Sequence, residues 1–209
     1  MRLYDCQTAP SPRRVRIFAA EKDISLENVS VDLATGEQFG DAFRAINPDC
    51  VVPALELNDG TCISEVIAIC HYLEALHPTP VLLGRTPVEQ ALTLMWNAKA
   101  EQQGLWATAD AFRNAARGLK DRALPGPDRY VQIPELAERG RARASSFLEK
   151  MNRQLDGHEF IAGDFYSLAD ITAMVFVEFA KRLKIALPDE AVHLQRWYED
   201  VASRPSASA

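Results

Sequence analysis

The sequence predicts an α/β domain over residues 1–78, a linker over residues 79–87 and an all-helical domain over residues 88–209. Two observations lead to this division. In the first part of the chain, short runs of alternating apolar residues are interleaved with helical patterns, whereas after residue 87 the apolar residues recur at helical spacing. Between the two parts the composition shifts to proline, glycine and threonine, which is typical of a domain boundary.

A strand, a helix and a second strand are expected at the start of the chain. Residues 1–4 form a strand-like run, and two prolines in the loop behind it delay the helix until near Arg13. Val29 and Val31 alternate with polar residues in segment 27–32, which predicts the second strand. A strand–helix–strand unit of this length predicts a parallel pair with a right-handed crossover.

A short helix is then expected from Gly36 to Ile46, where Pro48 ends it because the residue before a proline avoids helical angles. Two short strands follow, joined by a tight turn at residues 58–60, and a helix begins at Ser64. The predicted order is βαβαββα. This is the thioredoxin-like order, in which helices pack on a small mixed sheet.

The second domain is predicted to consist of helices over residues 87–112, 134–155, 171–183 and 189–203. The third of these is apolar nearly all round, which predicts the buried centre of the domain. Ser167 and Asp170 form a capping-box pattern before it, a folding signal to which we assign no chemistry. The tail after Pro205 is expected to be frayed.

Composition excludes several classes of function. Of the 209 residues, 47% are hydrophobic and 25% charged, as in ordinary soluble globular proteins, and the net charge of -6 argues against a nucleic-acid or membrane partner. No apolar run has the length of a membrane span or a signal peptide, so a cytoplasmic location is expected. The four cysteines form no C-x-x-C pair and have no histidine cluster beside them, so no metal is expected. Cys62 and Cys70 are predicted to be buried structural thiols.

The segment around Pro53 has the features of a binding site. Pro53 directly precedes a strand-like run, which predicts a sharp bend at this point. A cis peptide bond is one form of such a bend. The bend would leave the backbone groups of Val52 unpaired. The first N–H groups of the helix at Ser64 lack partners within the helix and attract an anion. Glu65 beside them can accept a hydrogen bond from an amine, so the pair suits the end of a free amino acid or a γ-glutamyl group. The alternative is that Ser64 caps the helix and Glu65 favours its first turn.

Over essentially its full length the chain resembles the bacterial cytosolic glutathione transferases (nu/zeta/theta-like). The matching motifs are N-P-x-x-x-V-P-x-L ending at Leu55, the acidic Glu65, and the segments A-I-C-H-Y-L-E from Ala68, S-L-A-D-I from Ser167 and R-W-Y…R-P-S near the C-terminus. The resemblance implies a thioredoxin-like glutathione-binding domain, a helical domain with a second-substrate pocket, and a homodimer. Glutathione would be a co-substrate, and no metal is implied.

The resemblance also implies roles for particular residues. Val52, before a cis Pro53, would pair its backbone with the cysteinyl part of glutathione, while Glu65 and the N–H of Val66 would hold the γ-glutamyl end. Many relatives have a serine where this chain has Val66, so Ser64 is a candidate substitute. Many also have a basic residue where this chain has Val51. Gln38 and the basic residues of the first helix are therefore candidates for the glycyl carboxylate.

The group that stabilises the glutathione thiolate is less clearly marked. The thiolate is the nucleophile, so a hydrogen-bond donor is needed near the sulfur. The serine or cysteine of several classes aligns with Ala9, whose side chain cannot donate. The loop T-A-P-S-P-R-R-V is closer to the nu-like pattern T-P-N-x-x-K, which selects Ser11, with Thr8 second and a backbone N–H third. The alternative for Ser11 is that it caps the first helix.

We therefore expect a glutathione transferase that directs the thiolate at a hydrophobic electrophile, as in detoxification. Trp106 and Phe112 are candidates for the second-substrate pocket, although aromatic residues at helical spacing also form plain core. Two alternatives remain open: a glutathione-dependent disulfide or peroxide reductase, and a non-catalytic glutathione-transferase-like binding module. Ala9, Val51 and Val66 favour the binding module.

Overall fold

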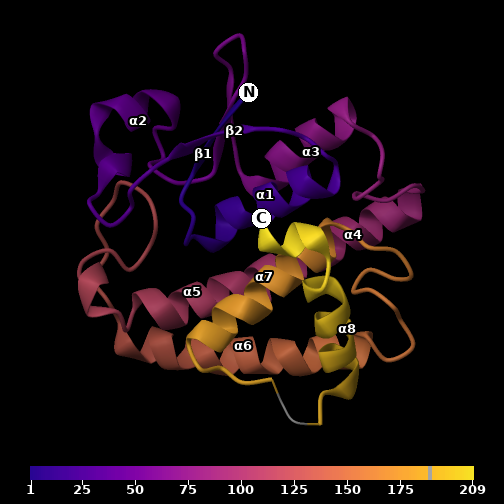
Figure 1. Ribbon diagram of the computed structural model, residues 1–209. Coiled ribbons are helices and arrows are strands. Elements are labelled where there is room, and N and C mark those ends of the chain that lie inside the picture. Colours follow the sequence, from indigo (N-terminus) through magenta and orange to yellow (C-terminus); the bar gives the residue numbers. More distant parts are fainter. Residues whose placement is uncertain (188–189) are drawn as a thin grey trace. The chain divides into compact units, whose positions relative to one another are not determined.

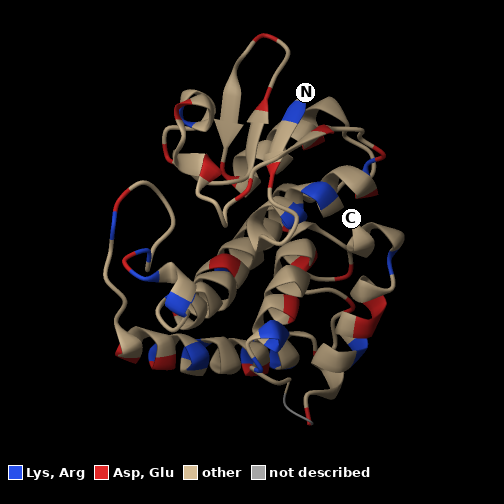
Figure 2. Ribbon diagram, turned by 60° about the vertical axis from the view of Figure 1, so that its left-hand side comes forward, with Lys and Arg blue, Asp and Glu red and all other residues tan. Residues whose placement is uncertain are grey.

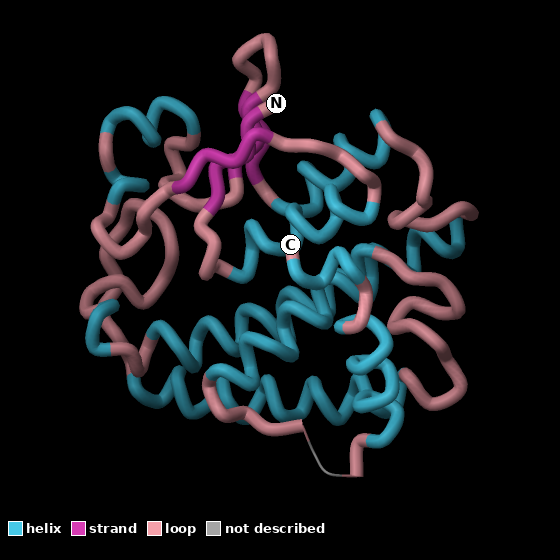
Figure 3. The backbone as a smooth tube through the Cα atoms, in the orientation of Figure 1, coloured by secondary structure: helices cyan, strands magenta, loops and turns pink. Residues whose placement is uncertain are grey.

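The computed structural model describes residues 1–187 and 190–209, and the chain forms two compact units (Figures 1 and 3). The first comprises residues 1–80, 125–128 and 208–209, and the second comprises residues 81–124 and 129–207. All strands of the sheet lie in the first unit, and the second is built from helices. The chain thus has an α/β thioredoxin-like domain and an all-α domain, as its sequence predicts.

A four-stranded sheet in the order β2-β1-β3-β4 forms the centre of the first unit. The strands are β1 (Arg2–Asp5), β2 (Glu27–Ser30), β3 (Ala54–Glu56) and β4 (Cys62–Ser64). β1 pairs with β2 in parallel and with β3 antiparallel, and β3 pairs with β4 antiparallel. The β1–β2 pair confirms the predicted parallel pairing, and the antiparallel β3–β4 pair confirms the predicted hairpin.

The helices of this unit are α1 (Pro10–Glu21), α2 (Asp41–Ile46), which follows a 3-10 turn at Glu37–Phe39, and α3 (Val66–Leu76). α1 and α3 pack side by side (Figure 1). Phe18 of α1 and Ile69 of α3 are fully buried together with Leu3 and Leu55 of the sheet. This core fixes both helices relative to the strands.

Three predicted helix starts in this unit were wrong. The helix expected from Gly36 to Ile46 is a 3-10 turn followed by α2, which begins only at Asp41. α1 begins at Pro10 rather than near Arg13, because proline is well accommodated at the first helical position, where its missing N–H removes no helical bond. α3 begins at Val66 with Glu65 as its N-cap residue, whereas Ser64 is the last residue of β4. The hairpin therefore extends to the residue before the cap.

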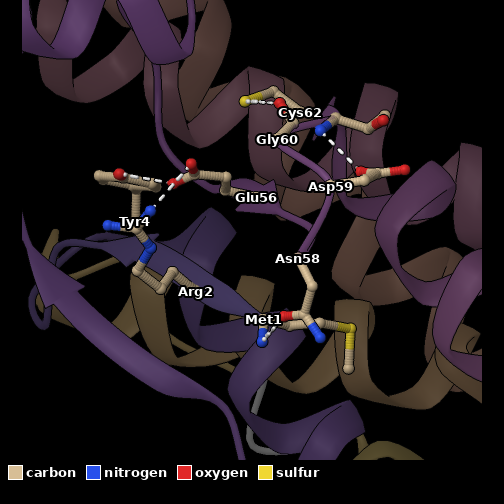
Figure 4. A network of polar contacts seen from close by, with 9 residues as sticks. Met1, Arg2, Tyr4, Glu56, Asn58, Asp59, Gly60 and Cys62 are labelled. Carbon is tan, nitrogen blue, oxygen red and sulfur yellow. Dashed lines mark hydrogen bonds and ion pairs between the residues drawn. The ribbon is translucent and has the colours of Figure 1, made fainter.

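The prediction that Cys62 is buried was also wrong. Cys62 lies at the start of β4 and is exposed, because β3 and β4 present one side of the hairpin to solvent. Figure 4 shows it near the turn of the hairpin, beside Glu56, which accepts hydrogen bonds from Arg2 and Tyr4 at 3.0 and 2.8 Å. Cys70, in contrast, is buried in α3 as predicted.

The helices of the second unit are α4 (Pro87–Lys99), α5 (Trp106–Arg113), α6 (Pro134–Gln154), α7 (Leu168–Arg182) and α8 (Val192–Ala202). A π-helical segment, Ala100–Leu105, joins α4 to α5, so the long predicted helix is interrupted there. Gly104 within this segment lies so close to the ring of Phe176 that a Cβ atom would be 2.7 Å from it. α7 is buried along most of its length and forms the centre of the unit, as predicted.

The capping box at the start of α7 is confirmed. The fully buried carboxylate of Asp170 accepts hydrogen bonds from the backbone N–H groups of Ile161 and Ser167, from the Ser167 hydroxyl and from the indole N–H of Trp197, at 2.8 to 3.0 Å. Burial raises the pKa of Asp170 to about 6, although all four hydrogen bonds favour the charged form.

The end of the chain differs from its prediction. The predicted start of the last helix at residue 189 lies outside the described residues, and the described helix α8 begins at Val192. The tail expected to be frayed instead forms a 3-10 turn, Pro205–Ser208, in which Ser206 and Ala207 are buried. Composition did not predict this turn, because small residues are found in buried turns as well as in frayed tails.

Acidic and basic residues are intermingled along the ribbons of the described chain (Figure 2). None of the described helices combines the length and the apolar character needed to cross a bilayer.

Candidate functional site

Three segments of the first unit meet at one edge of its sheet. β1 is antiparallel to β3, and β3 is antiparallel to β4, so β1 ends where β3 begins and β4 ends. The register pairs Tyr4 with Ala54, and Ala54 with Ser64. The β1–α1 loop, the residues before Ala54 and the residues after Ser64 therefore gather at this edge, which we call the strand-end site.

The Val52–Pro53 segment provides backbone groups to the strand-end site. The Val52–Pro53 peptide bond is cis, and Val52 lies outside β3. Among the described residues, neither the N–H nor the C=O of Val52 has a hydrogen-bond partner in the protein. A strand-like ligand can therefore pair with Val52 as a further strand would.

Asn47 holds the segment that leads to Val52. Its side chain is almost completely buried, and it donates from Nδ2 to the carbonyl oxygen of Val51 at 2.8 Å and accepts from the N–H of Asp49 at 3.2 Å. The intervening Cys50 has a φ of 54°, in the left-handed region. Apart from its place in the N-P-x-x-x-V-P-x-L motif, Asn47 was not predicted to have a role. A buried amide that bridges two backbone groups fixes the course of the loop.

The start of α3 provides the second part of the strand-end site. Glu65 has φ 68° and ψ 126°, a conformation that residues other than glycine rarely adopt, and its side chain is exposed. No side chain caps α3, so the predicted alternative in which Ser64 caps the helix is wrong. The N–H groups of Val66 and Ile67 have no hydrogen-bond partner among the described residues. The backbone N–H groups at this edge can thus bind the carboxylate of a ligand, and the neighbouring Glu65 side chain can accept a hydrogen bond from the amine of a ligand.

The β1–α1 loop provides the third part. It turns at residues 6–9, where the N–H of Ala9 donates to the carbonyl oxygen of Cys6 at 2.9 Å. Thr8 is exposed, and its Oγ1 lies 3.6 Å from the Sγ of Cys6. Ser11 lies in the first turn of α1, but Ala9 is the N-cap residue and no side chain caps this helix. The capping alternative for Ser11 is therefore wrong as well.

A buried ion pair lies beneath this loop. Arg16 Nη1 is 2.6 Å from Asp5 Oδ1, and Arg16 Nη2 donates to the carbonyl oxygen of Gln7 at 3.3 Å. Burial raises the pKa of Asp5, while the Arg16 guanidinium opposes that shift. This pair was not predicted from the sequence. Its signal was an arginine between Val15 and Ile17, two apolar residues of a buried helix.

Gln38 lies in the 3-10 turn before α2 and is only 4% exposed. Its Oε1 is buried and has no hydrogen-bond partner, and no partner exists for its side-chain nitrogen among the described residues. Of the basic residues in α1, Arg14 and Arg16 are buried, while Arg13 is half-buried.

Large aromatic residues of the second unit differ in exposure. Trp96 is buried and belongs to the core, whereas Trp106 is 50% and Phe112 39% exposed. Phe112 also makes an edge-to-face contact with Phe179, with ring centroids 5.9 Å apart. Trp106 and Phe112 are therefore available to a ligand of this unit. The described residues include no group of three or more side chains arranged to bind a metal ion.

Comparisons with known proteins point to one family. The model of the glutathione S-transferase N-terminal domain matches residues 8–76, and that of the C-terminal domain matches residues 124–205. Glutathione S-transferase 2 of Saccharomyces cerevisiae is 37% identical over 209 residues, which cover 99% of this chain and 87% of the relative. Maleylacetoacetate isomerase of Rattus norvegicus is 31% identical over 88% of this chain and 80% of its own length.

Solved structures agree with these sequence matches. A glutathione S-transferase domain-containing protein of Marinobacter aquaeolei VT8 is 39% identical, with a TM-score of 0.91 over 99% of each chain. Gtt2 of Saccharomyces cerevisiae also has a TM-score of 0.91, over 100% of this chain and 99% of that one.

Proposed function

Because the chain belongs to the glutathione S-transferase family, we propose that the strand-end site binds glutathione. The protein is a glutathione transferase, which uses the glutathione thiolate to attack an electrophilic small molecule. Its likeness to the yeast transferase over the full chain supports this activity over the reductase and binding-module alternatives. The observation that supports the location is the convergence of Val52, Glu65 and the β1–α1 loop at one edge of the sheet.

Glutathione is proposed to bind in an extended conformation across this edge. The unpaired backbone groups of Val52 pair with the cysteinyl residue. The N–H of Val66 binds the γ-glutamyl carboxylate, and the Glu65 carboxylate accepts from the γ-glutamyl amine. Pro53 and Ser64 flank these groups and shape the site. Gln38, whose side-chain nitrogen has no hydrogen-bond partner among the described residues, donates to the glycyl carboxylate.

The thiolate is stabilised in this proposal by a donor from the β1–α1 loop. Ser11 is the first candidate because it lies in the first turn of α1, where the helix dipole also favours negative charge. Thr8 is second. Rate enhancement comes from holding the two substrates together and from keeping the sulfur ionised at neutral pH.

The second substrate is proposed to be a hydrophobic electrophile that contacts Trp106 and Phe112 of the second unit. A homodimer is part of the same proposal, since α4 exposes apolar residues that include Val88, Leu94 and Met95. Detoxification in the cytoplasm is the proposed setting, without a nucleic-acid or membrane partner.

Retention on immobilised glutathione, followed by turnover with a generic aromatic electrophile and with an organic hydroperoxide, tests the function. Retention with conjugation of the electrophile is expected. Turnover of the hydroperoxide alone would favour a reductase, and retention without either reaction would favour the binding module. Absence of retention and of turnover would contradict the proposal.

A further inference from the structure

Ser11 and Arg14 lie one helical turn apart on α1 and are hydrogen-bonded to each other. Nη2 of Arg14 donates to Oγ of Ser11 at 3.3 Å. Arg14 is only 5% exposed, so its guanidinium is held within the protein rather than free in solvent, and Ser11 is half-buried. An arginine that deep in a domain is unusual, and its contact with Ser11 is at the edge where the glutathione sulfur is proposed to lie.

The direction of this hydrogen bond decides what the Ser11 hydroxyl can do. A guanidinium has only donors, so the oxygen of Ser11 must be the acceptor. The hydrogen of the hydroxyl is thereby left for another acceptor, and among the described residues it has none in the protein. A hydroxyl that accepts from a cation is also polarised, which makes it a stronger donor to a second partner.

We propose that Arg14 is a positioning residue for the transferase reaction, which orients and polarises Ser11 so that its hydroxyl donates to the glutathione sulfur. This inference rests on the proposed function, in which Ser11 is the thiolate donor. The step is an ionisation: the S–H bond of glutathione breaks, the sulfur keeps the electron pair, and the proton leaves to water. Ser11 keeps its own proton throughout and contributes a hydrogen bond.

The neighbouring contacts support a preorganised hydroxyl. Arg16 contacts Asp5 and the carbonyl oxygen of Gln7 from the same helix, so the loop before Ser11 has an anchor other than Arg14. α1 uses Ala9 as its N-cap residue, so the helix does not need the Ser11 oxygen. The Arg14–Ser11 contact therefore sets the hydroxyl direction without a competing structural role for that oxygen.

The test measures the pKa of glutathione bound to the full chain, from the ultraviolet absorbance of the thiolate as a function of pH. The variants are Ser11→Ala, Arg14→Met, the double variant and Arg14→Lys. Ser11→Ala is expected to raise the thiol pKa by about one unit. Arg14→Met is expected to raise it by a similar amount, and the double variant no further than either alone. Glutathione affinity above the thiol pKa should change little.

Arg2→Met is the matched control, because it removes a cation of the same unit at the other end of β1 (Figure 4). It is expected to leave the thiol pKa at the wild-type value, and a rise equal to that of Arg14→Met would contradict a specific role for Arg14. If circular dichroism shows that Arg14→Met does not fold, the thiol pKa in Arg14→Lys tests the role of Arg14 instead. Lysine keeps the charge but lacks the planar fork that reaches Ser11, so a raised pKa supports the inference and an unchanged one contradicts it.

The outcomes separate the two proposals. An unchanged thiol pKa in Ser11→Ala would overturn Ser11 as the donor, and the role of Arg14 with it. A raised pKa in Ser11→Ala together with a wild-type value in both Arg14 variants would overturn only the positioning role. Failure of wild-type protein to bind glutathione would overturn the proposed function itself.

Discussion

Ala54 and Ser64 are partners across β3 and β4, and this pairing is the reason that Val52 and Glu65 lie at the same end of the hairpin. In an antiparallel pair, moving two residues back along one strand corresponds to moving two residues forward along the other. Val52 and Val66 are thus at equivalent distances from the last pair. One short hairpin therefore brings an unpaired backbone segment next to the start of a helix, which is the arrangement that we propose for glutathione.

Glu65 is expected to favour binding at the expense of stability. Because its φ of 68° is unfavourable for glutamate, Glu65→Gly should raise the free energy of unfolding by about 1 kcal/mol. The same change should raise KM for glutathione roughly tenfold or more, since a charge-assisted hydrogen bond is lost. Glu65→Gln is the control: it should weaken binding without the gain in stability. Urea unfolding measures the stability, and initial rates measure KM. A Glu65→Gly protein that is less stable than wild type would contradict the inference that the backbone of Glu65 is strained.

Asn47 is expected to act on glutathione binding through the loop before Val52. Asn47→Ala removes hydrogen bonds to Val51 and Asp49 and should cost about 1–3 kcal/mol of unfolding free energy. The folded variant should have a higher KM for glutathione than wild type, because the loop before Val52 is no longer held in place. Asn58→Ala, at the turn on the other end of the hairpin, should leave this KM unchanged. Equal KM values for Asn47→Ala and wild type would show that the loop keeps its course without the amide.

Thr93 and Thr172 provide a matched pair in the second unit, since both are fully buried in helices. The Thr93 hydroxyl has no hydrogen-bond partner within residues 1–187 and 190–209, whereas that of Thr172 donates to Oδ1 of Asn97 at 2.7 Å. Thr93→Val should therefore be neutral or stabilising. Thr172→Val should destabilise by about 1–3 kcal/mol, because it leaves the buried Asn97 oxygen unpaired. Denaturant unfolding of both variants measures the difference, and a larger loss for Thr93→Val would contradict this assignment.

Asp170 is expected to make stability depend on pH. Its folded pKa of about 6 lies above the ordinary aspartate value of 3.8, so between these values the folded protein holds a proton that the unfolded chain has released. The free energy of unfolding should therefore fall as pH rises through this interval, by roughly 3 kcal/mol in total. The raised pKa of Asp5 acts in the same direction.

The Asp170→Asn variant isolates this effect. It should be less stable than wild type at every pH, because an amide nitrogen would face hydrogen-bond donors. The fall in the free energy of unfolding with rising pH that is due to Asp170 should be absent. Unfolding free energies measured between pH 4 and pH 6 give the two slopes. Equal slopes in wild type and variant would show that Asp170 stays ionised throughout.

Much of the fold was predictable because local and long-range signals agree in this chain. The alternation at Val29 and the turn residues at 58–60 specify strands and a hairpin, and Ser167 and Asp170 specify the start of α7. Helix starts were harder to predict, because Pro10 and Ser64 are each compatible with more than one position. The π-helical segment at Ala100–Leu105 has no sequence signal of its own. It accompanies the close approach of Gly104 to Phe176, which depends on tertiary packing.

The parts of the candidate site that depend on backbone conformation were predictable from residue type. The parts that depend on side-chain contacts were harder to predict. Pro53 and the acidic Glu65 mark their segments by residue type alone. The pairing of Arg14 with Ser11, and of Arg16 with Asp5, depends on which arginine turns inward, and three arginines in four residues look alike in sequence. The exposure of Cys62 likewise follows from which side of the hairpin faces solvent.

A crystal structure of the protein with glutathione tests the central proposal most directly. The account predicts the γ-glutamyl carboxylate within about 3 Å of the Val66 N–H, and the cysteinyl backbone hydrogen-bonded to Val52. Glutathione bound at any other place, with Val52 and the start of α3 left without ligand contacts, would contradict it.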